Sequence, residues 1–115
     1  MGIDLVAVAE VAEAIATHGD RYLRRVYTAR ERADCRDDPA RLAARFAAKE
    51  AVRKALRGDG VAWPSVEVRL ETDGSPSLHL YGRAAELAET AGLAEFAVSL
   101  THEAGLAAAV VVASS

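Results

Sequence analysis

The segment from Arg45 to Leu56 constrains the fold of this chain more than any other segment. Residues that favour the α-helix fill it, mainly Ala, Leu, Arg, Lys and Glu, and Gly58 and Gly60 supply a stop just beyond it. Apolar residues recur on more than one side of the helical projection. We therefore predict a long, central and largely buried helix over about residues 39–57.

Two charged side chains, Glu50 and Lys54, fall inside the alanine-rich arc of this helix. Burying a charge without a partner is costly, so each of them needs one. The plain alternative is an ordinary pair of opposite charges at i and i+4 on a solvated face. Lys49 and Lys54 are also the only lysines among 14 basic residues, and lysine suits contact with a single phosphate oxygen or proton transfer.

The composition excludes several kinds of protein. A chain of 115 residues that is 51% hydrophobic and 27% charged is expected to form one globular domain, residues 1–115. A net charge of −3 without a basic tail argues against a nucleic-acid-binding protein, and no apolar run is long enough for a membrane helix. The single cysteine, Cys35, excludes an intrachain disulfide, and with the absence of a signal-peptide pattern it favours the cytoplasm.

The remaining patterns predict a mixture of strands and short helices. Helical spacing is expected at about 9–18, a short amphipathic turn at Arg21–Val26, a helix begun by a Thr28–Glu31 capping box, and a helix at Gly82–Ala91. Strands are expected at Gly2–Val8, Ser65–Glu71, Ser77–Leu80, Phe96–Leu100 and Leu106–Val112. The last of these is almost wholly apolar, so we expect it inside the sheet.

Two polar residues are conspicuous at the ends of predicted strands. Asp4 shares its strand face with two valines, so it is either a strand-end residue exposed to solvent or a ligand. His102 is expected in the turn between the last two strands, flanked by Ser99 and Thr101. Such strand-end loops commonly carry function, although a purely structural histidine is the commoner case.

Three separated pieces of the sequence resemble one family. They are the opening GIDL at Gly2–Leu5, the RFAAKEA-x-x-KA helix at Arg45–Ala55, and the VSLTH turn at Val98–His102 followed by an apolar strand. In this order and spacing, the chain resembles a small phosphopantetheinyl transferase of the holo-acyl-carrier-protein synthase type over essentially its whole length. The resemblance implies an α+β fold with the long helix packed on an antiparallel sheet, and a homotrimer with sites between subunits.

The activity that the resemblance implies is transfer of 4′-phosphopantetheine from coenzyme A to a serine of an apo acyl or peptidyl carrier protein, releasing adenosine 3′,5′-bisphosphate. Asp4 and Glu50 would hold Mg²⁺, because two protein carboxylates suit a magnesium ion that also takes diphosphate oxygens and water. Lys54 would stabilise negative charge on the β-phosphate and on the departing bisphosphate. The base that takes the serine proton stays open among Glu50, a metal-bound water and Lys54.

The same resemblance implies a second group of residues that hold coenzyme A. His102 and Ser99 would help to hold coenzyme A, with His102 at its 3′-phosphate. Arg45, Lys49 and the turn at Gly58 would be lesser nucleotide contacts.

One position departs from the family pattern and affects the expected partner. Glu10 stands where the family usually offers an arginine to an acidic carrier protein. The basic face of Arg21, Arg24 and Arg25 is expected to take over docking, and a specialised carrier domain of a polyketide assembly line is a possible partner. The sequence leaves two alternative functions: a catalytically silent protein that binds a carrier or coenzyme A, and a hydrolase with His102 as base, for which no nucleophile is recognisable.

Overall fold

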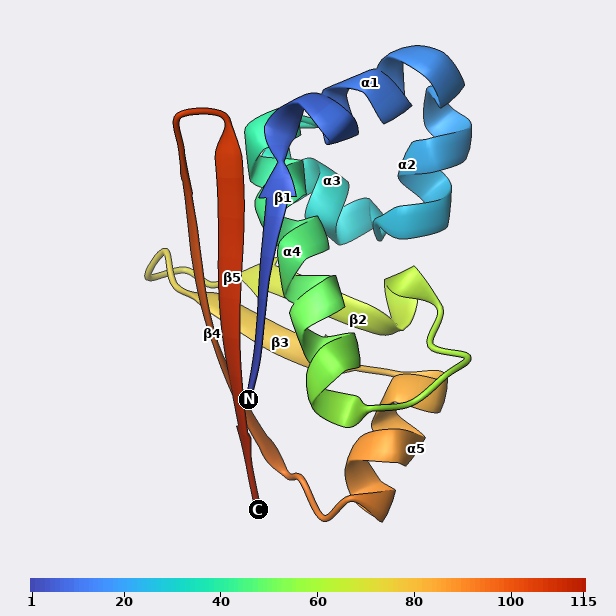
Figure 1. Ribbon diagram of the computed structural model, residues 1–115, viewed down its shortest axis with the longest axis vertical. Coiled ribbons are helices and arrows are strands. Elements are labelled where there is room, and N and C mark those ends of the chain that lie inside the picture. The colour runs from blue at the N-terminus through green and yellow to red at the C-terminus, as the bar shows by residue number, and fades with distance from the viewer.

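The computed structural model describes residues 1–115 as five strands and five α-helices with one short 3₁₀ turn, η1. The strands are β1 (Gly2–Ala7), β2 (Val66–Leu70), β3 (Pro76–Leu80), β4 (Glu95–Glu103) and β5 (Leu106–Ser114). The helices are α1 (Val8–His18), α2 (Asp20–Val26), α3 (Ala29–Cys35), α4 (Pro39–Leu56) and α5 (Gly82–Thr90), and η1 spans Trp63–Ser65. Figure 1 shows their arrangement, with α1 and α5 at opposite ends of the molecule.

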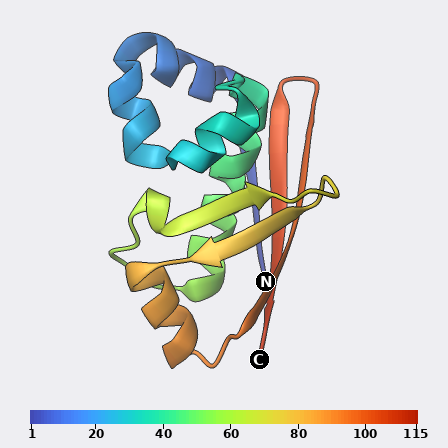
Figure 2. The ribbon, with the colours of Figure 1, turned by 180° about the vertical axis from the view of Figure 1, so that it is seen from behind.

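The strands form two antiparallel sheets, which gives the expected α+β fold. The larger sheet has the order β1-β5-β4, so the apolar β5 is its central strand, as its composition predicted. The smaller sheet is the β2–β3 hairpin. It crosses behind the long helix α4, as the view from behind shows (Figure 2). No helix is both long and apolar enough to cross a membrane.

The larger sheet has one face buried beneath α4 and one face exposed. Because side chains alternate along a strand, Ala107, Ala109 and Val111 of β5 face α4 and are buried. The outer face carries large apolar side chains that remain exposed in this chain. They are Ile3, Leu5, Leu106 and Val112, whose exposed fractions are 62, 63, 45 and 48%.

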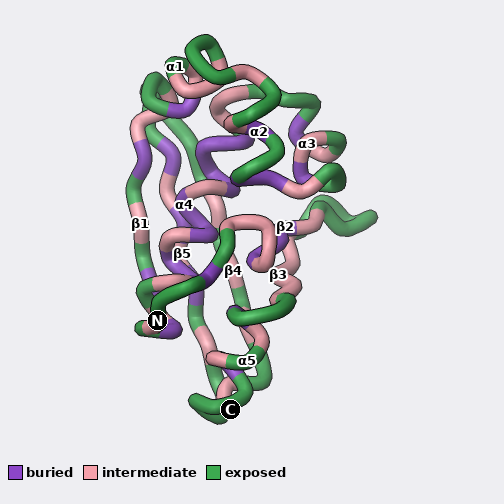
Figure 3. Tube along the Cα trace, turned by 90° about the vertical axis from the view of Figure 1, so that its right-hand side faces the viewer, coloured by how far each residue is buried: buried purple, intermediate pink, exposed green.

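Helix α4 is the buried centre of the molecule, as predicted. It begins at the Asp38 cap, whose carboxylate accepts a hydrogen bond from the Arg41 amide at 3.1 Å, and ten of its side chains are buried. Its alanines allow the backbone of β1 to approach closely, and a Cβ added at Gly2 would lie 1.9 Å from the Ala51 carbonyl oxygen. Only glycine fits at position 2 without a shift of the strand or the helix. The burial of α4 and β5 is visible in Figure 3.

Most predicted elements are confirmed, and two are corrected. The Thr28–Glu31 capping box forms with both of its hydrogen bonds. Arg21–Val26 belongs to a regular helix, α2, rather than to a turn. Strand β4 continues to Glu103, because its last three residues pair with the first residues of β5. His102 therefore lies within a strand and not in a loop.

Candidate functional site

The side chains of Asp4 and Lys54 meet between β1 and the C-terminal half of α4. Lys54 Nζ lies 2.7 Å from Asp4 Oδ1 and also donates to the carbonyl of Ile3 at 3.2 Å. The Lys54 side chain is 55% exposed and that of Asp4 16% exposed, so the lysine is not buried as its helical arc suggested. A pair this exposed contributes about 0–1 kcal/mol, which leaves the ammonium free to turn toward another anion.

Glu50 lies one helical turn before Lys54, on the same side of α4. It is half-buried, and its carboxylate takes no part in the ion pairs of the chain, so Lys54 pairs with Asp4 rather than with Glu50. No group of three or more His, Cys, Asp or Glu side chains in the chain could hold a metal ion by itself. An ion held by Asp4 and Glu50 would need further oxygen ligands from water or substrate, which is the usual situation of Mg²⁺.

Lys49 is placed differently from the expectation. It is fully buried, and its Nζ donates to Glu31 Oε1 at 2.8 Å, to the Trp63 carbonyl at 3.1 Å and to the Val66 carbonyl. Burial lowers the pKa of Lys49, an effect that the neighbouring Glu31 carboxylate opposes. With its three donors satisfied inside the protein, Lys49 cannot contact a nucleotide in this structure, and that expectation is wrong.

Glu31 is the other half of this buried pair, and it connects three elements. Its carboxylate accepts hydrogen bonds from the amides of Thr28 and Val68, each at 2.9 Å, as well as from Lys49. The pair thereby ties α3 and β2 to α4. Because Lys49 directly precedes Glu50, this network also fixes how α4 is rotated against its neighbours.

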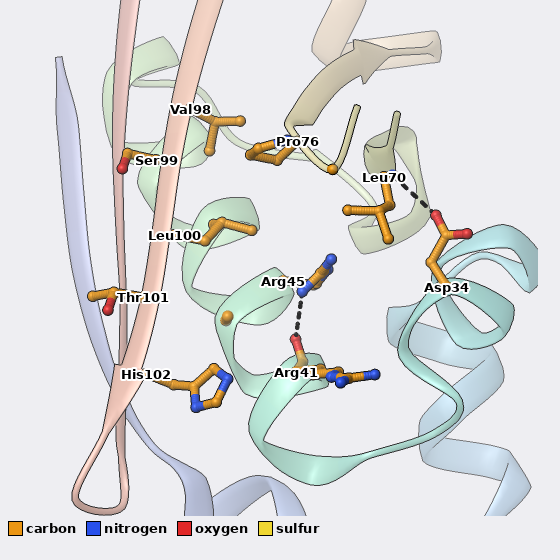
Figure 4. A pocket seen from close by; sticks show the side chains of 12 residues that line it. Asp34, Arg41, Arg45, Leu70, Pro76, Val98, Ser99, Leu100, Thr101 and His102 are labelled. Carbon is orange, nitrogen blue, oxygen red and sulfur yellow. Dashed lines mark hydrogen bonds between the residues drawn. The ribbon is translucent and has the colours of Figure 1, made fainter. Parts of the chain in front are cut away.

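A cavity of about 460 Å³ opens on the other side of α4, between this helix, the β2–β3 hairpin and β4. Arg41, Arg45 and His102 line it, and Asp34 is the one carboxylate in its wall (Figure 4). Arg45 is only 9% exposed, and its Nη1 donates to the Arg41 carbonyl at 3.4 Å. Its buried Nε has no hydrogen-bond partner, and an unsatisfied cationic donor favours an anion beside it.

Ser99 and His102 both belong to the lining of this cavity, but their side chains point in different directions. They are three positions apart on β4, so their side chains point to opposite faces of the sheet. Figure 4 shows His102 directed toward α4, whereas Ser99 and Thr101 point away to the outer face. The expected role of Ser99 in holding coenzyme A stays a prediction, since Ser99 belongs to the cavity lining but its side chain points to the other face of the sheet.

Gly58 lies beyond the end of α4, far from the cavity. Thirteen residues separate it from Arg45, or roughly 20 Å along a helix. A Cβ added at Gly58 would lie 2.4 Å from a methyl carbon of Leu87 on α5, so close packing accounts for this glycine. It does not line the cavity with Arg45 and His102.

The sequence reasoning missed some residues at both places. Arg41 lines the cavity one helical turn before Arg45. The i, i+4 spacing of the two arginines could have predicted that they share one face of the helix. Near Glu50, the Arg53 guanidinium lies 4.1 Å from the centre of the Trp63 ring. No local pattern predicts that contact, because Trp63 comes from the separate turn η1.

The two groups of residues lie on opposite flanks of α4. Arg41 precedes Glu50 by nine residues, as Arg45 precedes Lys54, and nine steps of about 100° amount to two and a half turns, which places the members of each pair on opposite sides of the helix. The buried Ala47 and Ala48 lie between, where α4 packs on the sheet. One chain therefore presents carboxylates and a lysine on its β1 flank and a cationic cavity on its β4 flank.

Comparison with known proteins gives a consistent result. Residues 1–111 match the family model of the 4′-phosphopantetheinyl transferase superfamily. A holo-[acyl-carrier-protein] synthase of Frankia casuarinae is 46% identical over 100% of this chain and 96% of its own, and that of Herpetosiphon aurantiacus is 42% identical over 96 and 94%. The crystal structure of Helicobacter pylori holo-[acyl-carrier-protein] synthase in complex with coenzyme A superposes with a TM-score of 0.88 at 29% identity, covering 98% of both chains.

Proposed function

The chain belongs to the 4′-phosphopantetheinyl transferase superfamily and is a holo-[acyl-carrier-protein] synthase, and from this premise we propose how its residues carry the reaction. Such an enzyme transfers phosphopantetheine from coenzyme A to an acyl carrier protein. The observation that best supports catalytic activity is the contact between Asp4 and Lys54, which are fifty residues apart in the sequence. Lys54 lies one helical turn after Glu50, so the three side chains belong to one region of the surface. Intact-mass spectrometry of an apo carrier incubated with the chain and coenzyme A tests the activity.

Asp4 and Glu50 are proposed to hold Mg²⁺ together with oxygens of the coenzyme A diphosphate. The donor chemistry fits, because both are carboxylates and Glu50 makes no ion pair within the chain. Bound magnesium would supply positive charge to the diphosphate. Asp4 is already paired with Lys54, so binding the ion would replace one cationic partner of Asp4 by another.

The chain's own residues are proposed to act on the phosphoryl group as follows. The serine oxygen of the carrier forms a bond to the β-phosphorus, and the bond from that phosphorus to the bridging oxygen breaks. Adenosine 3′,5′-bisphosphate leaves with the bridging oxygen, and Lys54 stabilises the negative charge that develops there. The serine proton passes to a base. Glu50 is the stronger candidate for this base, because its carboxylate has no partner in the chain, whereas Lys54 would have to lose its own proton before it could accept one.

Arg41, Arg45 and His102 are proposed to hold the 3′-phosphate end of coenzyme A. Three basic side chains converge on one cavity, and the unsatisfied Nε of Arg45 offers a donor that a phosphate oxygen would satisfy. This retains the expected roles of Arg45 and His102. It removes Lys49 from that role, since Lys49 is buried, whereas Gly58 lies outside this cavity and its contact with the nucleotide stays a prediction.

A homotrimer with sites between subunits is proposed from the same geometry. A single coenzyme A cannot reach both flanks of α4 in one chain without crossing the packed helix, but it could lie between the β1 flank of one copy and the β4 flank of the next. The exposed apolar outer face of the sheet, with Ile3 and Leu5, gives a surface for such an assembly. Ser99 points to that same face and would then lie at a subunit boundary.

A further inference from the structure

Helix α1 carries exposed acidic side chains and the next helix, α2, carries exposed basic side chains, and four of these charges have no partner within the chain. Glu10 and Glu13 are exposed on α1, and Arg21 and Arg25 are exposed on α2. None of the four forms an ion pair within the chain, although Arg24, between the two arginines, is paired with Asp20 at 3.2 Å. These four charges are therefore available to a partner.

The two pairs of charges border adjoining hollows of the surface. Glu10 and Glu13 line one hollow, Arg21 and Arg25 line the next, and His18 at the end of α1 borders both. We call this surface the α1–α2 strip. Its acidic end lies on α1 and its basic end on α2, with His18 between them.

The basic end of the α1–α2 strip continues toward α4. Arg25 also borders a third hollow, which Arg53 and Trp63 line. The Arg53 guanidinium lies over the Trp63 ring at 4.1 Å and has no acidic partner in the chain. Because Arg53 directly precedes Lys54, the strip runs from Glu10 to the neighbourhood of the proposed catalytic residues.

We propose that the α1–α2 strip docks a carrier-protein helix of mixed charge, with basic residues facing α1 and acidic residues facing α2. This inference rests on the proposed transferase function and concerns which carriers are accepted. Opposite charges facing each other favour the correct encounter, and like charges facing each other exclude wrong partners. A helix that is acidic along its whole length would meet Glu10 and Glu13 with like charge.

The proposal is tested with three forms of one apo carrier protein: its helix acidic throughout, or with the acidic residues at either end replaced by lysine. For the wild-type chain, we expect one of the two lysine forms to have an apparent KM about tenfold lower than the acidic form, with kcat unchanged. In the Glu10→Lys/Glu13→Lys variant, both ends of the strip are basic, so the carrier with the fully acidic helix should have the lowest apparent KM. The control Glu86→Lys/Glu89→Lys replaces two exposed glutamates by lysines on α5, at the other end of the molecule, and should preserve the wild-type preference.

Binding of the same carriers, fluorescently labelled and followed by anisotropy at low and high salt, separates docking from catalysis. Transfer with the same KM for all three carriers, in the wild type and in the double lysine variant, would overturn the docking proposal alone. Absence of transfer to every carrier would overturn the proposed function, and the binding preference would then still decide whether the strip docks mixed-charge helices.

Discussion

Lys54 Nζ lies 2.7 Å from Asp4 Oδ1, and this contact places the only exposed lysine of the chain beside a half-buried carboxylate. Lys49, five positions earlier on the same helix, is fully buried against Glu31. The two lysines of this chain therefore have opposite surroundings. That difference separates a catalytic role from a structural one and can be tested with matched substitutions.

Lys54→Met removes the ammonium but keeps an apolar stem of similar length. We expect transfer to carrier protein to slow by about 100-fold, mainly in kcat, because a charge that stabilises the transition state is lost. The free energy of unfolding should change by no more than about 1 kcal/mol, since the Lys54 side chain is 55% exposed to solvent. Steady-state kinetics and urea unfolding measure both quantities, and full turnover in this variant would remove Lys54 from the mechanism.

Lys49→Met should have the opposite effect. It leaves the Glu31 carboxylate buried with only its two amide donors, and breaking a buried ion pair on one side costs about 3–5 kcal/mol. Urea unfolding should show this loss, and adding Glu31→Gln should recover part of it because the uncompensated charge is removed. If Lys49→Met unfolded at the same urea concentration as Lys54→Met, the buried pair would not stabilise the fold.

The stability of the chain should depend on Cys35 at alkaline pH. Burial raises the pKa of Cys35 to about 11, whereas an unfolded thiol ionises near about 8.5. The raised folded pKa means that this contribution to stability is complete below about pH 8.5 and is lost as the pH rises toward 11. Between pH 7.5 and 10, wild type should lose about 1–2 kcal/mol more than Cys35→Ala in urea unfolding. Parallel losses in the two proteins would contradict a buried, neutral thiol.

Leu5→Asp places a carboxylate on the exposed outer face of the sheet, next to Ile3. If three copies assemble through this face, sedimentation equilibrium should show three chains of 12.1 kDa for wild type and single chains for the variant. Arg83→Asp introduces the same carboxylate on α5 and should leave the assembly intact. A monomeric wild type that still transfers phosphopantetheine would disprove the shared site.

The parts of the fold that follow from local pattern could be predicted from the sequence. The apolar run of β5 indicated a central strand, the Thr28–Glu31 spacing indicated a capping box, and the composition of α4 indicated a buried helix; all three are present. The GIDL, RFAAKEA and VSLTH motifs together indicated the family, which the comparisons confirm. These signals lie within one segment each.

The contacts that depend on packing between distant segments could not be predicted. Lys49 looked available because nothing near it in sequence indicates that Glu31 lies against α4. His102 was expected in a turn because the predicted strand ended at Leu100. Once β4 is known to pair with β5 through Glu103, simple alternation places His102 on the face toward α4 and Ser99 on the opposite face.

The measurement that tests the central claim most directly is intact-mass spectrometry of an apo carrier protein incubated with coenzyme A, magnesium and either wild type or Glu50→Gln. We expect wild type to add one phosphopantetheine to the carrier and to stop doing so when a chelator is added. Glu50→Gln should be slower by about 100-fold or more, because one carboxylate both for the ion and for the serine proton is lost, while its unfolding curve stays close to that of wild type. Transfer at the wild-type rate by Glu50→Gln, or undiminished transfer in the chelator, would contradict the site proposed on this flank of α4.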